Sequence, residues 1–330
     1  MLPRDVATSV LIVGGGPCGL MLANELGRRG VDALLVDDKL STAFNPQANA
    51  TQARTMEHYR RLGFADEVRA LGLPPDYPTD IAYFTRFATY ELARFSLPSA
   101  REARSRVSTL SGSWSTAELP HRVSQKFVEQ LLRRHAEALP GISLRYGWRL
   151  LAFTDHGTHV TAEVVPIAGG PRATVRAAYL VGADGPRSLV RRQLCFQYVG
   201  EAGVVRDFMG GRMYALYVRA PSFYSVVRHA PAWMHFTFNR DRRAFLAAVD
   251  GRAEFAFHTH SRRPSARRSR SSCCRASPGR PATRWSPSGS RPGGCSWAAT
   301  RPTCSRRPAG SATTRRSTTP SISAGSWPPR

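Results

Sequence analysis

The first 260 residues carry the two hydrophobic periods that distinguish strands from helices. Short apolar runs at 10–13 and 33–36 predict parallel strands that are buried on both faces. Apolar residues at helical spacing predict helices over 17–29, over the second half of 45–63, and from Ser124 onward. Further short apolar runs predict strands near 143–145, 150–153, 160–165 and 174–181, with the last two paired.

The pattern changes after residue 195, where aromatic-rich segments alternate between apolar and polar positions. These segments predict an antiparallel sheet with strands at 212–219, 233–239, 243–249 and 254–258. Residues 81–97 show the same alternation, so we expect a two-stranded excursion that joins this sheet. Residues 101–118 show only a weak pattern and are expected to form a loop. A crevice between this sheet and the first domain is the expected place for a small-molecule pocket.

A glycine-rich turn follows the first predicted strand, which runs into Gly14-Gly15-Gly16-Pro17-Cys18-Gly19 and then into a helix. In this strand–turn–helix context, G-x-G-x-x-G indicates a dinucleotide site rather than a glycine turn without a ligand. Gly14 permits the tight turn, Gly16 lets the backbone approach a pyrophosphate, and Gly19 lets the helix pack against the strand. The helix N-terminus adds free N–H groups and a positive dipole end.

Polar residues at other element ends extend this candidate site. Asp37 ends the second predicted strand about 20 residues after the glycines, where a carboxylate accepts hydrogen bonds from ribose hydroxyls. Asp184 and Gly185 follow the strand near 174–181, and ligands in open α/β sheets bind beyond such carboxyl ends. Gln125 lies in the first turn of its helix and would point at whatever the sheet edge binds. Arg54, at the start of another helix, is placed to face an anionic ligand.

Composition and charge alter this picture only in the last 70 residues. The formal net charge is +24, but residues 261–330 contain 15 arginines and no Lys, Asp or Glu, which leaves +9 for residues 1–260. No apolar stretch reaches the roughly 18 residues of a membrane span, and no signal peptide is recognisable, so we expect a cytoplasmic protein without a membrane partner. Cys18 and Cys195 lack redox or metal spacing, and His258 and His260 have no evident third ligand, so we expect no metal site.

Three sequence patches, in this order, resemble the FAD-dependent aromatic hydroxylases, the single-component flavoprotein monooxygenases typified by p-hydroxybenzoate hydroxylase and phenol hydroxylase. The patches are V-G-G-G-P-x-G-L with its acid, H-R-V-S-Q-x-x-x-E-x-x-L, and Y-L-V-G-A-D-G-x-R-S-x-V-R, and A-R-T-M-E-H-Y-R-R-L-G adds a fourth. The resemblance covers residues 5 to about 259. It is closest to the phenol hydroxylase-like branch that includes actinobacterial polyketide hydroxylases.

The resemblance implies a cofactor and a role for each candidate residue. Gly14, Gly16 and Gly19 would hold the FAD pyrophosphate, and Asp37 would hold the ribose. Gln125 would contact the flavin side, and Arg54 would lie near the FAD. Asp184 and Gly185 would serve both FAD and NAD(P)H. The implied reaction uses NADPH or NADH to reduce the flavin, which binds O₂ as a C4a-hydroperoxide and transfers one oxygen atom to a phenolic or polyketide aromatic ring.

Two positions depart from the family pattern. The family often carries a basic residue where Gln47 stands, and phenol hydroxylase has an aspartate where Asn49 stands. That aspartate helps to deprotonate the substrate, so no catalytic residue is assigned to this chain.

The expected fold class is α/β (α+β overall), with a Rossmann-like FAD-binding domain built on a parallel sheet and an antiparallel substrate sheet. The FAD-binding domain is expected at 1–80 and 101–194, the substrate domain at 81–100 and 195–260, and a non-family tail at 261–330. We expect the tail to be disordered, because it combines high net charge with no apolar periodicity.

The tail lacks the later family motifs G-R-V-x-L-x-G-D-A-A-H, P-x-G-G-x-G-x-N and W-K-L-A in the printed reading frame. With the frame moved back by one base, codons 293–303 can read Gly-Arg-Val-Phe-Leu-Gly-Gly-Asp-Ala-Ala-His. The other two motifs can follow at 307–314 and 324–328. We therefore hypothesise a frameshift, in the gene or in its sequencing, at or shortly after His260, and expect the lost motif to impair FAD binding and hydroxylation.

Two other functions stay open at this point. The chain could be another flavin oxidoreductase of the same fold, an oxidase or a Baeyer–Villiger-type oxygenase. It could also be a non-catalytic remnant whose arginine-rich tail binds polyanions without sequence preference. We expect no specific nucleic-acid partner, and the sequence indicates neither the substrate ring nor the oligomeric state.

Overall fold

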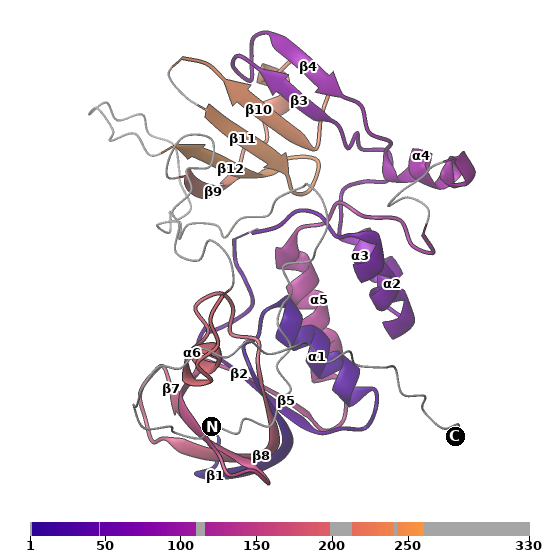
Figure 1. Cartoon of the computed structure of the whole chain (residues 1–330). Helices are drawn as coiled ribbons and strands as arrows, with labels where there is room; N and C mark the ends of the chain where they lie inside the picture. The colour runs from indigo at the N-terminus through magenta and orange to yellow at the C-terminus, as the bar shows by residue number, and fades with distance from the viewer. Residues whose placement is uncertain (1, 46, 110–115, 199–212, 241–242, 261–330) are drawn as a thin grey trace, which may run out of the picture.

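Two six-stranded sheets make up the computed structural model, which describes residues 2–45, 47–109, 116–198, 213–240 and 243–260 (Figure 1). The first sheet has the order β5-β2-β1-β8-β7-β6 and the second the order β4-β3-β10-β11-β12-β9. The predicted α/β class with a second sheet is confirmed. The proposed domain boundaries stay a prediction, and residues 261–330 lie outside the described residues.

The first sheet contains a parallel core of four strands, because β5, β2, β1 and β8 pair in parallel. The two remaining strands, β7 and β6, add antiparallel pairs at one edge. The strands are β1 (Asp5–Val13), β2 (Ala33–Asp37), β5 (Ile142–Tyr146), β6 (Trp148–Asp155), β7 (Val160–Pro166) and β8 (Ala173–Gly182).

Strand β1 is buried on both faces, as its continuous apolar run predicts. Val10 and Ile12 belong to a core with helices α1 (Pro17–Gly27) and α5 (Gln125–Glu137). Leu11 and Val13 belong to a second core on the opposite face. Helices α1 and α5 lie side by side (Figure 1), joined by a 2.9 Å hydrogen bond that the Nδ2 atom of Asn24 donates to the carbonyl of Leu132.

Several helices end or begin where the sequence predicts. Helix α2 (Ala53–Leu62) ends at Gly63, whose φ of 91° is the left-handed conformation that favours glycine. Helix α1 ends two residues before its predicted end. The predicted loop over 101–118 is wrong at its start, because α4 (Ala100–Ser105) forms there. Ser99 and Glu102 cap each other's backbone N–H groups, a capping box that is visible in the sequence.

The second sheet includes the 81–97 excursion, which joins it as β3 and β4 at one edge. Its strands are β3 (Ile81–Phe84), β4 (Glu91–Phe95), β9 (Met213–Arg219), β10 (Met234–Phe238), β11 (Arg243–Ala248) and β12 (Glu254–His260). The expectation of a purely antiparallel sheet is wrong at one ladder, since β3 and β10 pair in parallel. These two strands are distant in sequence, so no hairpin constrains their relative direction.

The remaining helices are short. They are α3 (Ala65–Ala70), α6 (Leu189–Gln193), α7 (Phe223–Val226) and the 3₁₀ turn η1 (Val107–Thr109). Helix α5 starts below the second sheet and runs along the first, so its N-terminus lies where the two sheets approach each other (Figure 1).

Candidate functional site

The glycine turn after β1 is packed so closely that two of its glycines have no room for a side chain. Gly14 has φ +114°, and a Cβ atom there would lie 2.3 Å from the carbonyl oxygen of Ala183. A Cβ on Gly19 would lie 1.9 Å from the carbonyl oxygen of Gly14. Glycine at these positions therefore lets β1, α1 and the segment after β8 meet at one point.

Gly16 differs from its neighbours because its surroundings are open. A Cβ there would meet no atom within 4 Å, and its backbone is extended, with φ −79°. Gly16 is the N-cap of α1, and no side chain forms a cap hydrogen bond there. The first N–H groups of α1 are therefore left for an anionic ligand, which the dipole of the helix also favours.

Asp37 and Tyr146 hold the main chain of Gly15 from two sides. The Oδ2 atom of Asp37 accepts a 2.6 Å hydrogen bond from the N–H of Gly15. The hydroxyl of Tyr146 donates a 3.0 Å hydrogen bond to the carbonyl of Gly15. Asp37 and Tyr146 are paired residues at the ends of β2 and β5. Burial raises the pKa of Tyr146, so its hydroxyl stays protonated and remains a donor.

The two carboxylate oxygens of Asp184 differ in their hydrogen bonding. Its Oδ2 atom accepts a 2.6 Å hydrogen bond from the N–H of Leu189 and thereby caps the start of α6. Its Oδ1 atom is buried and has no hydrogen-bond partner among the described residues. The next residue, Gly185, has φ +77° with open space around it. A buried carboxylate oxygen without a donor is costly unless a ligand or water supplies one.

Gln125 begins α5 beside the segment that follows β2. Its main-chain N–H donates a 2.7 Å hydrogen bond to the carbonyl of Ala48. Its side-chain Nε2 atom donates a 2.6 Å hydrogen bond to the Oε1 atom of Glu129, one turn later. Ser124 occupies the predicted N-cap, but its hydroxyl caps no N–H group and has no partner among the described residues. The side-chain oxygen of Asn49 is likewise buried without a partner.

Arg54 is placed differently from the other candidate residues. Its side chain is 81% exposed and pairs with Glu57 on the same helix, with 2.8 Å between nitrogen and oxygen. The structure therefore gathers Gly14, Gly16, Gly19 and Asp37 at the carboxyl ends of β1 and β2, with Asp184 and Gly185 beside them after β8. Gln125 lies at the adjacent end of α5, while Arg54 points to solvent.

Three residues near the site carry interactions that the sequence reasoning missed. Tyr146 directly follows the strand predicted near 143–145 and is the β5 partner of Asp37, so this position could have indicated it. Glu129 stands in the quoted H-R-V-S-Q-x-x-x-E patch without an assigned role. Arg133 stacks over the ring of Tyr146 at 4.6 Å and donates to the hydroxyl of Ser41, contacts that no local pattern encodes.

An aromatic row crosses one face of the second sheet. Tyr83, Phe236, Phe245 and His258 are cross-strand partners on β3, β10, β11 and β12. Neighbouring ring centroids lie 5.3, 5.4 and 4.2 Å apart along the row. Burial lowers the pKa of His258 to about 4, so its imidazole is neutral at physiological pH.

The same face of the sheet meets the start of α5. The Nζ atom of Lys126 lies 3.2 Å from the hydroxyl of Tyr217 on β9, and that hydroxyl donates to Glu254 on β12. Phe127 of α5 and Met234 of β10 both pack against the adjoining apolar cluster of Ala247, Val249 and Ala256. The aromatic face is therefore turned towards the helix whose first residue is Gln125.

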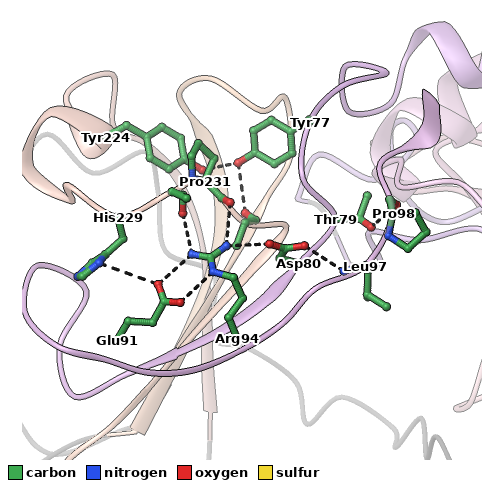
Figure 2. A network of polar contacts seen from close by, with 12 residues as sticks. Tyr77, Thr79, Asp80, Glu91, Arg94, Leu97, Pro98, Tyr224, His229 and Pro231 are labelled. Carbon is green, nitrogen blue, oxygen red and sulfur yellow. Dashed lines mark hydrogen bonds and ion pairs between the residues drawn. The ribbon is translucent and has the colours of Figure 1, made fainter. Parts of the chain in front are cut away.

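Arg94 forms the polar network that holds the excursion to the rest of the second sheet (Figure 2). Its guanidinium pairs with Glu91 at 2.8 Å and Asp80 at 2.9 Å, and donates to the carbonyl of Pro231 at 3.1 Å. His229 approaches Glu91 at 3.9 Å. This network fixes the geometry of β3 and β4 and is separate from the glycine turn.

A cavity of about 650 Å³ lies away from the glycine turn, between α3, α4 and the turn at 250–252. Both charges line this cavity: two of its four arginines are paired with acids, Arg69 with Glu118 and Arg101 with Asp76, and the carboxylates of Asp66 and Asp250 also line it. We therefore locate the candidate site from the glycine turn and its hydrogen bonds. Among the described residues, no group of three His, Cys, Asp or Glu could hold a metal ion.

A parallel sheet with a glycine turn, a strand-end acid and an open helix N-terminus defines a dinucleotide-binding protein of the α/β class. The chain belongs to the family described as the FAD binding domain, whose sequence model matches residues 7–278. The resemblance to FAD-dependent aromatic hydroxylases is confirmed by the relatives below. No helix in the described part of the chain has both the length and the apolar character needed to cross a membrane.

The similar curated proteins are FAD-dependent or aromatic monooxygenases. The chain is 34% identical over 189 residues to the FAD-dependent monooxygenase apdD of Emericella nidulans, covering 56% of this chain and 30% of that protein. It is 35% identical over 205 residues to the aklavinone 12-hydroxylase DnrF of Streptomyces peucetius subsp. caesius, covering 61% and 40%. The chain therefore spans less than half the length of these relatives.

Solved structures with the same fold include two flavoprotein complexes. The flavin-dependent monooxygenase PieE, in complex with FAD and substrate, matches with a TM-score of 0.67 and 27% identity, over 81% of this chain and 45% of that chain. A ternary complex of aklavinone-11 hydroxylase with FAD and aklavinone matches with a TM-score of 0.64 and 26% identity, over 81% and 48%.

Proposed function

We propose that this chain is the FAD-binding and substrate-sheet part of an NAD(P)H- and FAD-dependent monooxygenase that inserts one oxygen atom of O₂ into a phenolic or polyketide aromatic ring. The observation that carries the proposal is the buried Oδ1 atom of Asp184, which has no hydrogen-bond partner in the part of the chain that the structure describes and lies next to the glycine turn and the open N-terminus of α1. A cofactor with phosphates and hydroxyl donors satisfies both features at once.

The residues present fit FAD. Gly16 and the start of α1 would take the pyrophosphate, Asp37 the ribose and Gln125 the flavin side. Asp184 and Gly185 would serve both FAD and NAD(P)H. Bound FAD supplies the chemistry that side chains lack, since reduced flavin activates O₂ for oxygen transfer to an electron-rich ring. The protein's part is to bind the cofactor, to orient the ring and to exclude water.

The aromatic row on the second sheet supports an aromatic substrate. Tyr83, Phe236, Phe245 and His258 form a half-buried apolar strip on the face turned towards α5. Ring edges in this strip favour contact with the π face of an electron-rich ring. The neutral imidazole of His258 can accept a hydrogen bond from a ring hydroxyl, whereas a cation there would not.

The printed chain is proposed to bind FAD weakly and not to hydroxylate, because the family's second FAD motif is missing from residues 261–330. The test compares this chain with one whose gene has its reading frame restored just after codon 260. Flavin fluorescence quenching measures FAD binding, and NAD(P)H consumption with ¹⁸O₂ and a phenolic or polyketide substrate measures oxygen transfer.

The restored protein is expected to purify yellow and to place one ¹⁸O atom on the ring. A yellow protein that reduces O₂ without labelling the ring would favour an oxidase of the same fold, and ¹⁸O in an ester product would favour a Baeyer–Villiger oxygenase. A restored protein that folds but binds no FAD would contradict the proposal.

A further inference from the structure

Hydrogen bonds spaced four residues apart along the α5 region hold the segment that follows β2 in place. Four residues at or just before α5, each four positions from the next, contact the segment after β2, residues 41–45 and 47–51, which we call the strap. The pairs are His121 with Thr51, Gln125 with Ala48, Glu129 with Ala43, and Arg133 with Ser41. The strap includes Gln47 and Asn49, the two positions that depart from the family pattern. Its contacts with α5 therefore position a segment beside the candidate cofactor site.

Glu129 is the buried member of this series. The residue is 2% exposed, and both of its carboxylate oxygens accept hydrogen bonds from neutral donors. The Oε1 atom accepts from the Nε2 atom of Gln125 at 2.6 Å, and the Oε2 atom accepts from the main-chain N–H of Ala43 at 2.7 Å. One side chain thus fixes both a candidate cofactor residue and the strap.

A carboxylate can only accept, whereas a glutamine amide has one accepting and one donating end. Gln125 must therefore turn its NH₂ group towards Glu129. The carbonyl oxygen of its amide is left for whatever lies beyond the end of α5. The orientation of Gln125 follows from the chemistry of its neighbour and does not depend on how the amide is drawn.

We propose that Glu129 is a positioning residue that makes Gln125 present a hydrogen-bond acceptor to the cofactor. The inference rests on the proposed function, because it takes FAD as the ligand. FAD offers hydroxyl and N–H donors along its length, and an acceptor held in advance binds them without a loss of side-chain freedom. Among the described residues, the carboxylate of Glu129 forms its hydrogen bonds with Gln125 and with Ala43 of the strap.

Substituting Glu129→Gln separates this role from simple packing. The new amide at position 129 can accept from the fixed N–H of Ala43, which leaves its own NH₂ group facing Gln125. Gln125 then turns over to accept that hydrogen bond and presents its NH₂ group to the cofactor. The strap is kept, but the polarity offered to FAD is reversed.

The first measurement needs no cofactor. NMR hydrogen exchange on the full chain follows the backbone amide of Ala43 and the side-chain NH₂ of Gln125. In Glu129→Gln the Ala43 amide is expected to stay protected while the Gln125 NH₂ group loses protection. Glu163→Gln, an exposed position on β7, is the matched control and should change neither signal. Loss of both protections in Glu129→Gln, or of neither, would overturn the proposal.

The second measurement is FAD affinity from flavin fluorescence quenching. Glu129→Gln is expected to bind FAD about tenfold more weakly, the equivalent of one net hydrogen bond. The swapped double variant Gln125→Glu with Glu129→Gln keeps the net charge, places a carboxylate at position 125 and again offers an acceptor. It should recover most of the affinity. Unchanged affinity in Glu129→Gln, or no recovery in the swap, would overturn the positioning role.

The two proposals fail in different ways. If the unmodified chain and its frame-restored form both bind no FAD, the proposed function is contradicted. The exchange pattern at Ala43 and Gln125 then decides by itself whether Glu129 sets the orientation of Gln125.

Discussion

Asp37 and Gly15 are joined by a 2.6 Å hydrogen bond between a strand-end carboxylate and the main chain of the glycine turn. The residues lie 22 positions apart, and Asp37 is only 8% exposed. The second carboxylate oxygen accepts from the N–H of Lys39 at 2.7 Å, so Asp37 also shapes the turn that follows β2. The acid expected to meet the ribose therefore also holds the turn expected to meet the phosphates.

Asp37→Asn should lower the free energy of unfolding by about 1–3 kcal/mol. An asparagine amide has one accepting oxygen where the carboxylate has two, so either Gly15 or Lys39 loses the acceptor for its N–H group. Urea denaturation measures the change. Asp38→Asn is the control, because Asp38 is half exposed and pairs loosely with Arg149 at 3.5 Å, so its loss should cost no more than about 0.5 kcal/mol. Equal losses in both variants would show that the Gly15 bond contributes nothing measurable.

Gly19→Ala and Gly16→Ala should separate folding from ligand binding. Gly19→Ala places a methyl group against the Gly14 carbonyl and should cost about 1–3 kcal/mol of stability. Gly16→Ala meets no atom within 4 Å, so its stability should fall by no more than about 1 kcal/mol, the loss of a good N-cap. The new methyl group nevertheless occupies the proposed pyrophosphate approach. Thermal denaturation and FAD quenching measured on both variants should therefore give opposite rankings.

His235 should make stability fall in mild acid. It is fully buried among Phe84, Phe223 and Tyr224, and neither ring nitrogen has a hydrogen-bond partner in the described part of the chain. Burial, with the positive charge of Arg94, lowers its pKa to about 4 from an ordinary value of 6.5. The unfolded chain therefore binds the proton first, and the stabilising effect of a neutral His235 is complete above pH 6.5 and decreases towards pH 4.

The size of this effect follows from the pKa difference. Each pKa unit corresponds to about 1.4 kcal/mol, so this histidine should cost about 2 kcal/mol at pH 5. His235→Phe removes the titration and keeps the aromatic packing. The unfolding free energy of the variant minus that of the unmodified chain should therefore increase by about 2 kcal/mol when the pH is lowered from 7.5 to 5. Urea denaturation at the two pH values measures this difference. His121 and His258 titrate in the same direction and remain in both proteins, so a constant difference would rule out a role for His235.

Arg94→Leu should destabilise the second sheet far more than Arg101→Leu. Arg94 is buried except for 17% of its side chain, and its loss leaves Asp80 and Glu91 without their cation (Figure 2). We expect a loss of about 3 kcal/mol. Arg101 pairs with Asp76 on the surface, where such a pair contributes less than about 1 kcal/mol. Comparable losses in urea denaturation would mean that the Arg94 network is not a specific support of β3 and β4.

The DNA beyond codon 255 should encode the missing motif in the adjacent reading frame. Resequencing is expected to find Gly-Arg-Val-Phe-Leu-Gly-Gly-Asp-Ala-Ala-His across codons 293–303. These codons lie outside the described residues, so the DNA is the direct test. If the neighbouring frame lacks this motif, the frameshift hypothesis is wrong, and a remnant with a basic tail becomes the better interpretation of residues 261–330.

Local spacing in the sequence was enough to predict the strands of both sheets, the glycine turn, Asp37 and the family resemblance. Each of these depends on neighbouring residues, because periodicity and turn chemistry act over a few positions. Helix α4 was missed although its Ser99–Glu102 capping box is local, since the loop-like sequence around it masked that signal.

Tertiary structure alone decided the relationships between distant segments. The hydrogen bond from Tyr146 to Gly15 and the bond from Ala43 to Glu129 join residues that no short pattern relates. Packing also leaves the Oδ1 atom of Asp184 without a partner among the described residues. The parallel pairing of β3 with β10 is of the same kind. Sequence spacing determines which element a residue belongs to. Only the packing of whole elements determines which buried polar groups find partners and which are left for a ligand.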